Sequence, residues 1–447
     1  MRKVLIVTYY FPPSGGPGVQ RVLKFAKYLP QFGYEPVILT VDEGDYPAKD
    51  ESLLKSIPPE IKVIRTKIFE PYGMYRRLTG KKPGSAVDVE NIPTGKKRRP
   101  AERFAEFIRS TFFVPDARVG WLPFAVSGGM EAVAHDGIDI IYSSSPPYTS
   151  ALIAGSIKRK SGLPWVMGLR DPWTGFISAP QRWFIPAAID RRMEHSSVTN
   201  ADATEVAWEG IGRDLRSKYQ DINDNRIVYI PNGFDSEDYP AAPAENKGRF
   251  TITYTGSLYG RRNPRTILAA VQKLRAEGKI SPENIRLIFA GRFSSEVREM
   301  LADPALNGMI DVKEYIPHEE SIKLLLMSDL LLLIVDESPL SAEIVPGKVF
   351  EYIGARKPII AFAPEGAASK ILRNTGAGFV VAPEDVAGAA RLIGSFCGAG
   401  GEEYSAKKSG VYAPDEEAIK QFERKEAARK LASLFTKTLE RKNGQTA

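Results

Sequence analysis

The sequence predicts an α/β protein built from two doubly wound parallel sheets. Short β-branched runs alternate with segments of helical period along most of the 447 residues. The alternation occurs in two series of similar size, separated by a stretch from Pro240 to Gly248 that is typical of a linker. A chain of this length usually exceeds one hydrophobic core. We therefore expect two Rossmann-like domains, residues 1–240 and 241–411, facing one another across a ligand-binding cleft.

The first series opens with a strand and an amphipathic helix. Val4–Val7 is the expected strand, and Val19 to Leu29 then form one helical face. A helix ending near Lys160 is expected after Pro146-Pro147. Further strands are expected at Val37–Val41, Lys62–Arg65, Ile138–Tyr142, Trp165–Leu169 and Arg226–Ile230.

The second series repeats this order of elements. Its strands are expected at Phe250–Thr255, Arg286–Ala290, Asp311–Glu314, Leu330–Val335 and Lys357–Phe362. Pro346-Gly347 ends one element and permits a helix at Gly347–Gly354. A final amphipathic helix is expected across Ile419 to Leu439. Residues 71–100 show no clear period and are read as a mobile insertion or a lid.

Composition excludes several classes of protein. The single cysteine, Cys397, cannot form an intramolecular disulfide and suits a reducing cytoplasm. Three scattered histidines make a histidine-built metal site improbable. The longest apolar stretch, Leu324 to Val335, is short for a membrane span and contains Asp329. The apolar run at Val4–Val7 reads as a buried first strand rather than a signal peptide. We expect a cytoplasmic protein.

The net charge of +7 is concentrated in one region. Basic residues crowd residues 76–103, and four phenylalanines follow between Phe104 and Phe113. A solvated loop and an anionic membrane surface both remain open for residues 76–113, and the second places the protein at the inner face of the membrane. Nucleic acid is not an expected partner, because no recognition helix, zinc spacing or aromatic ribonucleoprotein pattern is present.

The segment from Glu343 to Glu351 carries the strongest functional pattern. Its two carboxylates are eight residues apart, on either side of the Pro346-Gly347 break. A helix beginning at Gly347 offers free backbone N–H groups and a positive dipole end, which suit a phosphate. Glu351, one turn inside, is placed to accept hydrogen bonds from sugar hydroxyls. A surface helix with scattered glutamates is the plain alternative.

Two glycine loops also lie where strands are expected to end. Gly15 and Gly16 follow the first strand without the dinucleotide pattern G-x-G-x-x-G, so the loop is either a ligand contact or a tight turn. Gly256 precedes Arg261 and Arg262, and guanidinium groups bind diphosphates bidentately; solvated surface charge is the alternative.

A carboxylate at a third strand end is a candidate for chemistry. Asp171 follows Arg170 after the strand Trp165–Leu169, where it could orient or deprotonate an acceptor hydroxyl. Asp before Pro is also a common helix cap, so this structural reading stays open.

Together these segments resemble family-4 glycosyltransferases of the GT-B architecture, over nearly the whole chain. The resemblance rests on the Gly15-Gly16 turn, the Arg261-Arg262 loop, the motif Pro231-Asn-Gly-Phe-Asp235, and above all Glu343 to Glu351. It implies a retaining transfer of a sugar from a nucleotide-diphosphate sugar to a hydroxyl of a glycan or lipid-linked acceptor. It also implies that residues 412–447 pack back onto the first domain. Cell-surface polysaccharide synthesis is the expected setting.

The resemblance also implies roles for individual residues. Glu351 matches the glutamate that holds the donor ribose, and Glu343 matches the one near the donor sugar. Gly347 and Lys348 present amides to the distal part of the donor, and Arg262 takes the place of a lysine on the diphosphate. Donor-binding candidates are Gly15, Gly16, Gly256, Arg261, Arg262, Gly347, Lys348 and Glu351.

The chain departs from the family in two places. Ser257 stands where the family usually has an arginine, which leaves Arg261 as a substitute. The first-domain loop around Tyr148 lacks the histidine that many members place near the reacting sugar. Asp171 and Glu343 are therefore the catalytic candidates, and Tyr148 and Arg170 are candidates for contacting the acceptor or the sugar.

No cofactor and no metal are expected. The alternative sugar-transfer fold requires an Asp-x-Asp metal ligand, and the sequence contains no such motif. The leaving diphosphate would be stabilised by cations and amides instead. Two alternatives stay open: a nucleotide-sugar epimerase of the same architecture, and a non-catalytic sugar- or membrane-binding scaffold.

Overall fold

The computed structural model divides the chain into two compact units. Unit 1 comprises Met1–Asn232 and Arg424–Ala447, and unit 2 comprises Gly233–Glu423. The sequence prediction placed these divisions at 240 and 412. The described residues are 1–46, 49–69, 107, 110–175, 182–240, 248–314, 316–336, 341–343, 345–397 and 412–445. All of the predicted insertion or lid at 71–100 lies outside them, and so does most of the basic and aromatic segment 76–113.

Unit 1 is built on a parallel sheet of seven strands in the order β3-β2-β1-β4-β5-β6-β7. The strands are β1 (Arg2–Thr8), β2 (Tyr34–Val41), β3 (Lys62–Thr66), β4 (Ile140–Ser145), β5 (Trp165–Leu169), β6 (Ala203–Val206) and β7 (Ile227–Tyr229). The central strands are buried on both faces, and β1 reads as an almost continuous apolar run, as expected for a parallel sheet between helices.

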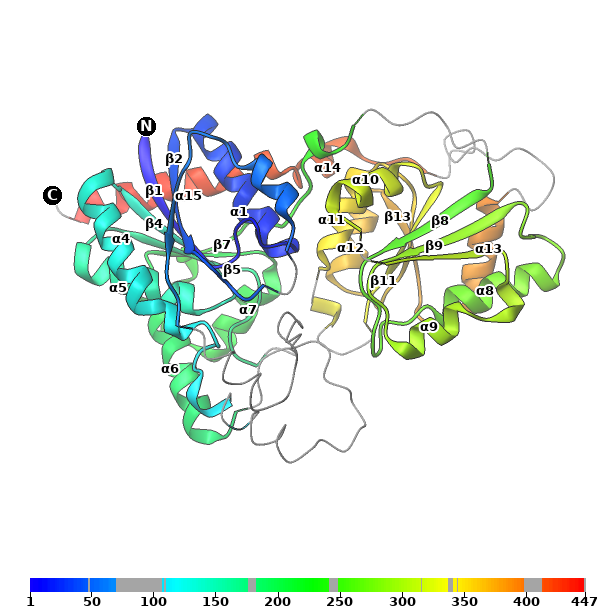
Figure 1. The fold of residues 1–447 in the computed structure, drawn as a ribbon, viewed down its shortest axis with the longest axis horizontal. Helices are drawn as coiled ribbons and strands as arrows, with labels where there is room; N and C mark the ends of the chain where they lie inside the picture. The colour runs from blue at the N-terminus through cyan, green and yellow to red at the C-terminus, as the bar shows by residue number, and fades with distance from the viewer. Residues whose placement is uncertain are drawn as a thin grey trace. The chain divides into compact units, whose positions relative to one another are not determined.

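Helices cover both faces of this sheet (Figure 1). They are α1 (Pro17–Tyr28), α4 (Leu122–Asp136), α5 (Thr149–Ser161), α6 (Phe184–Asn200), α7 (Glu209–Lys218) and α15 (Arg424–Gln445). Helices α1 and α15 pack together over one apolar layer that includes Val4, Ile6 and Phe435. Helices α4 and α5 pack against each other. The carboxyl-terminal helix is therefore an integral part of the unit 1 core.

Unit 2 repeats the arrangement with six parallel strands in the order β10-β9-β8-β11-β12-β13. The strands are β8 (Phe250–Thr255), β9 (Ile285–Ala290), β10 (Ile310–Lys313), β11 (Leu330–Ile334), β12 (Ile359–Phe362) and β13 (Gly378–Val381). The helices are α8 (Arg265–Ala276), α9 (Ser295–Leu301), α10 (His318–Leu326), α11 (Gly347–Gly354), α12 (Ala367–Asn374), α13 (Val386–Phe396) and α14 (Glu416–Lys420). Helices α8, α9 and α13 share one apolar core, and α10, α11 and α12 share a second.

The predicted fold class is confirmed, with two corrections of detail. The sequence prediction missed β6 and β13, which are only four residues long. The single helix expected across Ile419 to Leu439 is wrong, because the chain breaks between α14 and α15. Phe422 lies in this break, and its ring packs on Phe350 while its carbonyl accepts a hydrogen bond from the amide of Phe234. Burial of Phe422 in unit 2 thus separates the two helices.

Candidate active site

Each sheet has a point at which its strand order reverses. In unit 2 the reversal lies between the neighbouring strands β8 and β11, whose following helices cover opposite faces. Ligands of open α/β sheets bind outside the carboxyl ends of the strands at such a switch point. Gly256, Arg261 and Arg262 lie in the loop after β8, and the helix that begins at Gly347 follows β11. The donor-binding candidates of unit 2 therefore gather at its switch point.

The amino-terminal end of helix α11 is the candidate phosphate-binding element. It spans Gly347–Gly354, as the sequence predicted, and buries Val349, Phe350, Tyr352 and Ile353. Pro346 precedes it and supplies no side-chain cap, while Gly347 is exposed. The first N–H groups of a helix have no partner inside it and carry the positive end of the helix dipole. This terminus can therefore bind a phosphate group.

Two side chains of α11, one turn apart, fasten the helix to the carboxyl end of β8. The ammonium of Lys348 donates to the hydroxyl of Tyr254 at 2.9 Å and lies 4.6 Å from the centre of that ring. The hydroxyl of Tyr352 accepts from the amide of Thr255 at 2.9 Å. Tyr254 in turn donates to the carbonyl of Ser257 at 3.0 Å. Burial raises the pKa of Tyr254, so its hydroxyl stays protonated and can donate and accept at once.

Gly256 brings the main chain of the β8–α8 loop against the lysine ammonium. Its φ is +118°, a region that side chains rarely allow. A Cβ atom here would lie 2.0 Å from Nζ of Lys348. The structure thus explains why glycine stands at this position: the loop backbone and the cation occupy adjoining space at the switch point.

Glu351 lies one turn inside α11 with a partly exposed carboxylate. Its backbone carbonyl accepts a hydrogen bond from the hydroxyl of Tyr239 at 2.8 Å. Oε1 lies 4.0 Å from Nδ1 of His318, and Nε2 of His318 lies 3.8 Å from Oδ2 of Asp238. His318 was not among the residues predicted for the site. It starts α10 after Pro317, and only the packing of α10 beside α11 reveals it.

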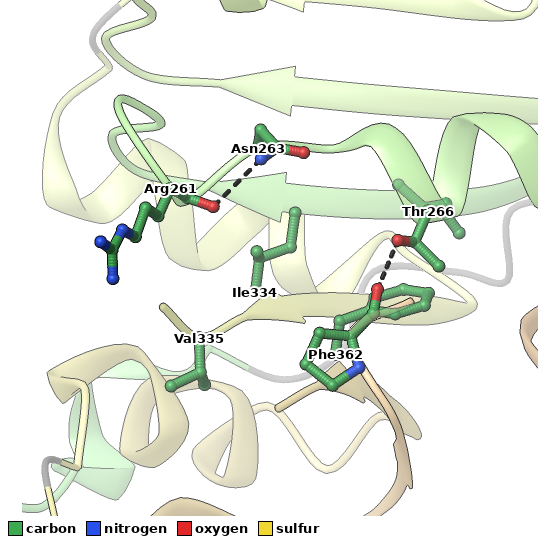
Figure 2. Close-up of a pocket in the computed structure, with 8 residues that line it drawn as sticks. Arg261, Asn263, Thr266, Ile334, Val335 and Phe362 are labelled. Atoms are coloured by element: carbon green, nitrogen blue, oxygen red, sulfur yellow. Dashed lines mark hydrogen bonds between the residues drawn. The ribbon is translucent and has the colours of Figure 1, made fainter. Parts of the chain in front are cut away.

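The two arginines of the β8–α8 loop differ in their surroundings. The guanidinium of Arg262 lies 5.3 Å from the centre of the Tyr259 ring, whereas Arg261 is exposed. Figure 2 shows a hollow beneath this loop, at the ends of β11 and β12, with the Arg261 guanidinium directed away from Ile334 and Phe362. The hollow is lined by Arg261, Asn263, Thr266, Ile267, Ile334, Val335, Phe362 and Pro383.

Glu343 ends a short 3-10 turn, Ser341–Glu343, and is half-buried. Residue 344 and residues 337–340 lie outside the described part of the chain. The catalytic role of Glu343 stays a prediction.

In unit 1 the sheet reverses between β1 and β4, and the loops after these strands carry Gly16 and Tyr148. The guanidinium of Arg170 joins the first turn of α1 to the loop after β4 by donating to the carbonyls of Gly18, at 2.6 Å, and of Pro146. Gly16 adopts φ +99° immediately before α1. Arg170 therefore fixes the main chain of the switch point, while its contact with an acceptor stays a prediction.

Tyr148 lies against the strand end that carries Asp171. Its ring stacks on Trp173 with centroids 4.8 Å apart and planes 14° apart, and its hydroxyl donates to the Pro172 carbonyl at 2.6 Å. Burial raises the pKa of Tyr148 well above its usual value, and the charge of Asp171 adds to the effect. Tyr148 is thus a neutral phenol that can position a ligand but cannot act as a base at neutral pH. Trp173 was not among the residues predicted for the site.

The described residues form no cluster that is suited to a metal ion. No group of three or more His, Cys, Asp or Glu side chains converges there to hold an ion. The expectation that no metal is required stays a prediction.

Known proteins match both units. The protein-family model described as "glycosyl transferase 4-like domain" matches residues 15–233. A second family model, described as "glycosyl transferases group 1", matches residues 235–405. A probable glycosyltransferase, WbjE of Pseudomonas aeruginosa, is 25% identical over 277 residues, which is 58% of this chain and 66% of WbjE. The chain thus spans slightly less than two thirds of that relative.

Solved structures show the same fold. Anabaena HepE, in complex with UDP and glucose, superposes with a TM-score of 0.62 at 14% identity, covering 98% of this chain and 100% of HepE. Sucrose-phosphate synthase from Thermosynechococcus elongatus gives 0.60 at 14% identity, covering 98% and 99%. The fold is the two-domain α/β GT-B architecture. The two family matches together span most of the chain, and they support a GT-B glycosyltransferase similar to family 4.

Proposed function

We propose that the protein transfers a sugar from a nucleoside-diphosphate sugar to a hydroxyl of a glycan or lipid-linked acceptor, with retention at the anomeric carbon. One observation carries the donor half of this proposal. At the switch point of unit 2, the ammonium of Lys348, the loop backbone at Gly256 and the uncapped terminus of α11 lie together. HepE, with the same fold, is described in complex with UDP-glucose.

The chemistry follows from the charge that develops on the leaving group. Departure of a nucleoside diphosphate places negative charge on its outer phosphate. Preorganised cations and amides stabilise such charge strongly because they need no reorganisation during the reaction. Lys348 is held in place by Tyr254, and we assign it and Arg262 to the diphosphate. Glu351 binds the ribose hydroxyls, and Asp171 orients the acceptor hydroxyl. The diphosphate itself assists attack on the same face of the sugar.

The setting of the reaction is part of the proposal. We place it at the cytoplasmic side of a membrane in the assembly of surface polysaccharide, without a metal ion. Support for a membrane-proximal acceptor comes from the basic and aromatic residues of segment 76–113, most of which lie outside the described residues. Within the described part of the chain, the helices are too short or too polar to cross a bilayer.

The test is a kinetic comparison of matched variants after a nucleotide-sugar panel has identified the donor by thermal shift. Loss of a charged contact to the leaving diphosphate costs about 2–4 kcal/mol, so Lys348→Ala and Arg262→Ala should each lower kcat/KM about 30- to 900-fold. Arg265→Ala is the control, because Arg265 is exposed and pairs with Glu296 at 2.9 Å. Unchanged kcat/KM in both site variants would contradict the proposal.

Product analysis separates the remaining alternatives. The proposal requires an acceptor-dependent glycoside whose anomeric configuration, read by NMR coupling constants, equals that of the donor. An isomerised nucleotide sugar formed without acceptor would identify an epimerase. Donor binding without turnover under any acceptor condition would identify a scaffold. Activity that is lost in a chelator and restored by a divalent cation would remove the metal-independent part.

A further inference from the structure

The first half of α6 and the segment before α4 expose a cluster of large apolar side chains. We call this cluster the aromatic platform; it consists of Phe112, Trp183, Phe184, Ile185 and Ile189, all of them exposed. Phe112 and Phe184 are 70% and 76% exposed. The rings of Trp183 and Phe184 meet edge to face at 5.3 Å. Nε1 of Trp183 donates to Oγ1 of Thr111 at 2.9 Å, which brings Phe112 beside α6. Clustered exposed apolar side chains mark an interaction surface.

A buried arginine holds the platform in place. The side chain of Arg182 is only 3% exposed. Its Nε donates to Asp190 at 3.0 Å, and Nη1 donates to the carbonyl of Ser110 at 2.8 Å. Nη2 donates to the carbonyls of Phe113 and Pro115 at 3.0 and 2.6 Å. One guanidinium thus fastens α6 to the segment that carries Phe112. The exposed rings belong to a built surface rather than to a loose loop.

The acidic side chains of α6 are buried, whereas two of its basic side chains are exposed. The only two carboxylates of this helix, Asp190 and Glu194, are both buried. Arg191 and Arg192 follow the platform and are exposed, and neither has an ion-pair partner among the residues that the structure describes. The outer surface of this half of α6 therefore offers apolar groups and positive charge without a carboxylate. Apolar side chains beside arginines match the acyl boundary and anionic headgroups of a lipid surface.

The platform is also connected to the acceptor-side candidates of unit 1. Asp190 binds Arg182 through one oxygen and accepts from Nε1 of Trp173, at 2.8 Å, through the other. Trp173 is the residue on which Tyr148 stacks. A single run of contacts within unit 1 therefore leads from the exposed platform to the loop of Asp171. A surface that positions the protein on lipid would be rigidly linked to these residues.

We infer that unit 1 docks on an anionic lipid surface through the aromatic platform, with Arg191 and Arg192 on the headgroups. This docking site shares only Phe112 with segment 76–113 and contains none of the basic residues of 76–103. The idea that docking brings the protein to a lipid-linked acceptor rests on the proposed function. The docking itself does not depend on that function. Lipid binding can therefore be measured without donor or acceptor, and the two ideas can fail separately.

The chain carries its own probe for the test. Its five tryptophans are all in unit 1. Trp183 is 38% exposed, whereas Trp121, Trp165, Trp173 and Trp208 are at most 7% exposed. The full-length protein is mixed with vesicles of phosphatidylglycerol and phosphatidylcholine in which part of the acyl chains is brominated. Bromine quenches only nearby rings, so we expect quenching that disappears in Trp183→Phe. Equal quenching in that variant would overturn the inference.

Vesicle flotation then measures the strength of docking. Each cation near an anionic surface is worth about 1 kcal/mol, so Arg191→Gln with Arg192→Gln should weaken partitioning about 30-fold. Phe184→Gln should weaken it about tenfold. Controls in unit 1 are Leu54→Gln, an exposed apolar side chain, and Arg159→Gln, an exposed arginine of α5. Both should bind as the wild type does.

Three results would contradict the inference. The first is no binding to anionic vesicles. The second is binding that the platform variants and the controls leave equally intact, which would assign it to the basic segment. The third is a change of oligomeric state in Phe184→Gln, seen by light scattering, which would assign the platform to a second copy of the chain. Turnover with a soluble acceptor should remain unchanged in all platform variants, because none of these residues belongs to the proposed catalytic machinery.

Discussion

Replacement of Arg21 is expected to destabilise unit 1 severely and in a pH-dependent way. Arg21 lies in α1 with its side chain 1% exposed, paired with the fully buried Glu205 of β6. It also donates to the carbonyls of Ile230 and Pro231, at 2.8 and 2.9 Å, and to Oδ1 of Asn232 at 2.9 Å. These contacts fix the last residues of the chain before it leaves unit 1. Arg21→Met keeps the apolar stem and removes all of them.

The magnitude follows from the charge that is left behind. Removing one partner of a buried ion pair typically costs about 3–5 kcal/mol, because the other charge stays buried and unpaired. For a unit of this size, 1 kcal/mol corresponds to about 2–4 °C, so the midpoint of thermal unfolding should fall by about 10 °C. Tryptophan fluorescence follows unit 1 alone, because all five tryptophans lie there. Arg159→Met, on the exposed side of α5, serves as the control.

The pH dependence identifies the cause. Burial raises the pKa of Glu205, while Arg21 and the hydroxyl of Tyr142, which donates to it at 2.9 Å, oppose that rise. Without Arg21 the folded-state pKa rises further above the unfolded value. A raised carboxyl pKa means that folding favours the protonated form of Glu205. The stability of the variant is therefore recovered as the pH falls toward the pKa of the unfolded state, and lost as the pH rises through the pKa of the folded state. The loss in Arg21→Met should therefore be larger at about pH 8 than at about pH 5.

Adding Glu205→Gln should restore much of the midpoint at pH 8, because the orphaned charge is gone while Tyr142 keeps an acceptor. If the midpoint of thermal unfolding falls by less than about 3 °C in Arg21→Met, or by the same amount at both pH values, this reasoning is refuted.

Two further predictions concern the switch point of unit 2. Gly256→Ala should weaken binding of the nucleotide sugar at least about tenfold, measured by calorimetry. A strained backbone costs about 1–3 kcal/mol, and the new Cβ would lie 2.0 Å from the Lys348 ammonium and displace it. Undiminished affinity would contradict this prediction. Tyr254→Phe keeps the ring beneath Lys348 but removes the hydroxyl, so kcat/KM should fall about fivefold, as expected for one hydrogen bond. A fall as large as that of Lys348→Ala would show that the ring position itself had changed.

The sequence predicted the long, regular features of the fold and missed the short ones. Strong apolar runs such as Val4–Val7 mark buried strands whatever their neighbours, and the Pro346-Gly347 break correctly marked the start of α11. Strand β6 was not predicted because it is short and contains Glu205, a residue type that usually lies at the surface. Its partner Arg21 lies 184 positions away in the sequence. Only the fold shows that the two charges meet.

The position of the candidate site could be predicted from the sequence, but the side-chain contacts that hold its residues in place could not. Glycines and charges after expected strands were enough to place Gly256 and Lys348 at the sheet edge. Tyr254 and Tyr352 were not recognised, because a tyrosine in an apolar strand or helix reads as core packing. Their hydroxyl contacts with Lys348 and Thr255 depend on the register of α11 against β8, which local patterns do not specify.

The central claim is that unit 2 binds a nucleoside diphosphate at its switch point. The most direct measurement is a crystal structure of the full-length protein soaked with UDP or GDP, with calorimetry of Glu351→Ala beside the wild type. We predict the diphosphate at the amides of Gly347 and Lys348 next to Gly256, the ribose hydroxyls on the carboxylate of Glu351, and weaker binding in the variant. A ligand bound away from α11, or equal affinity in both proteins, would contradict the claim.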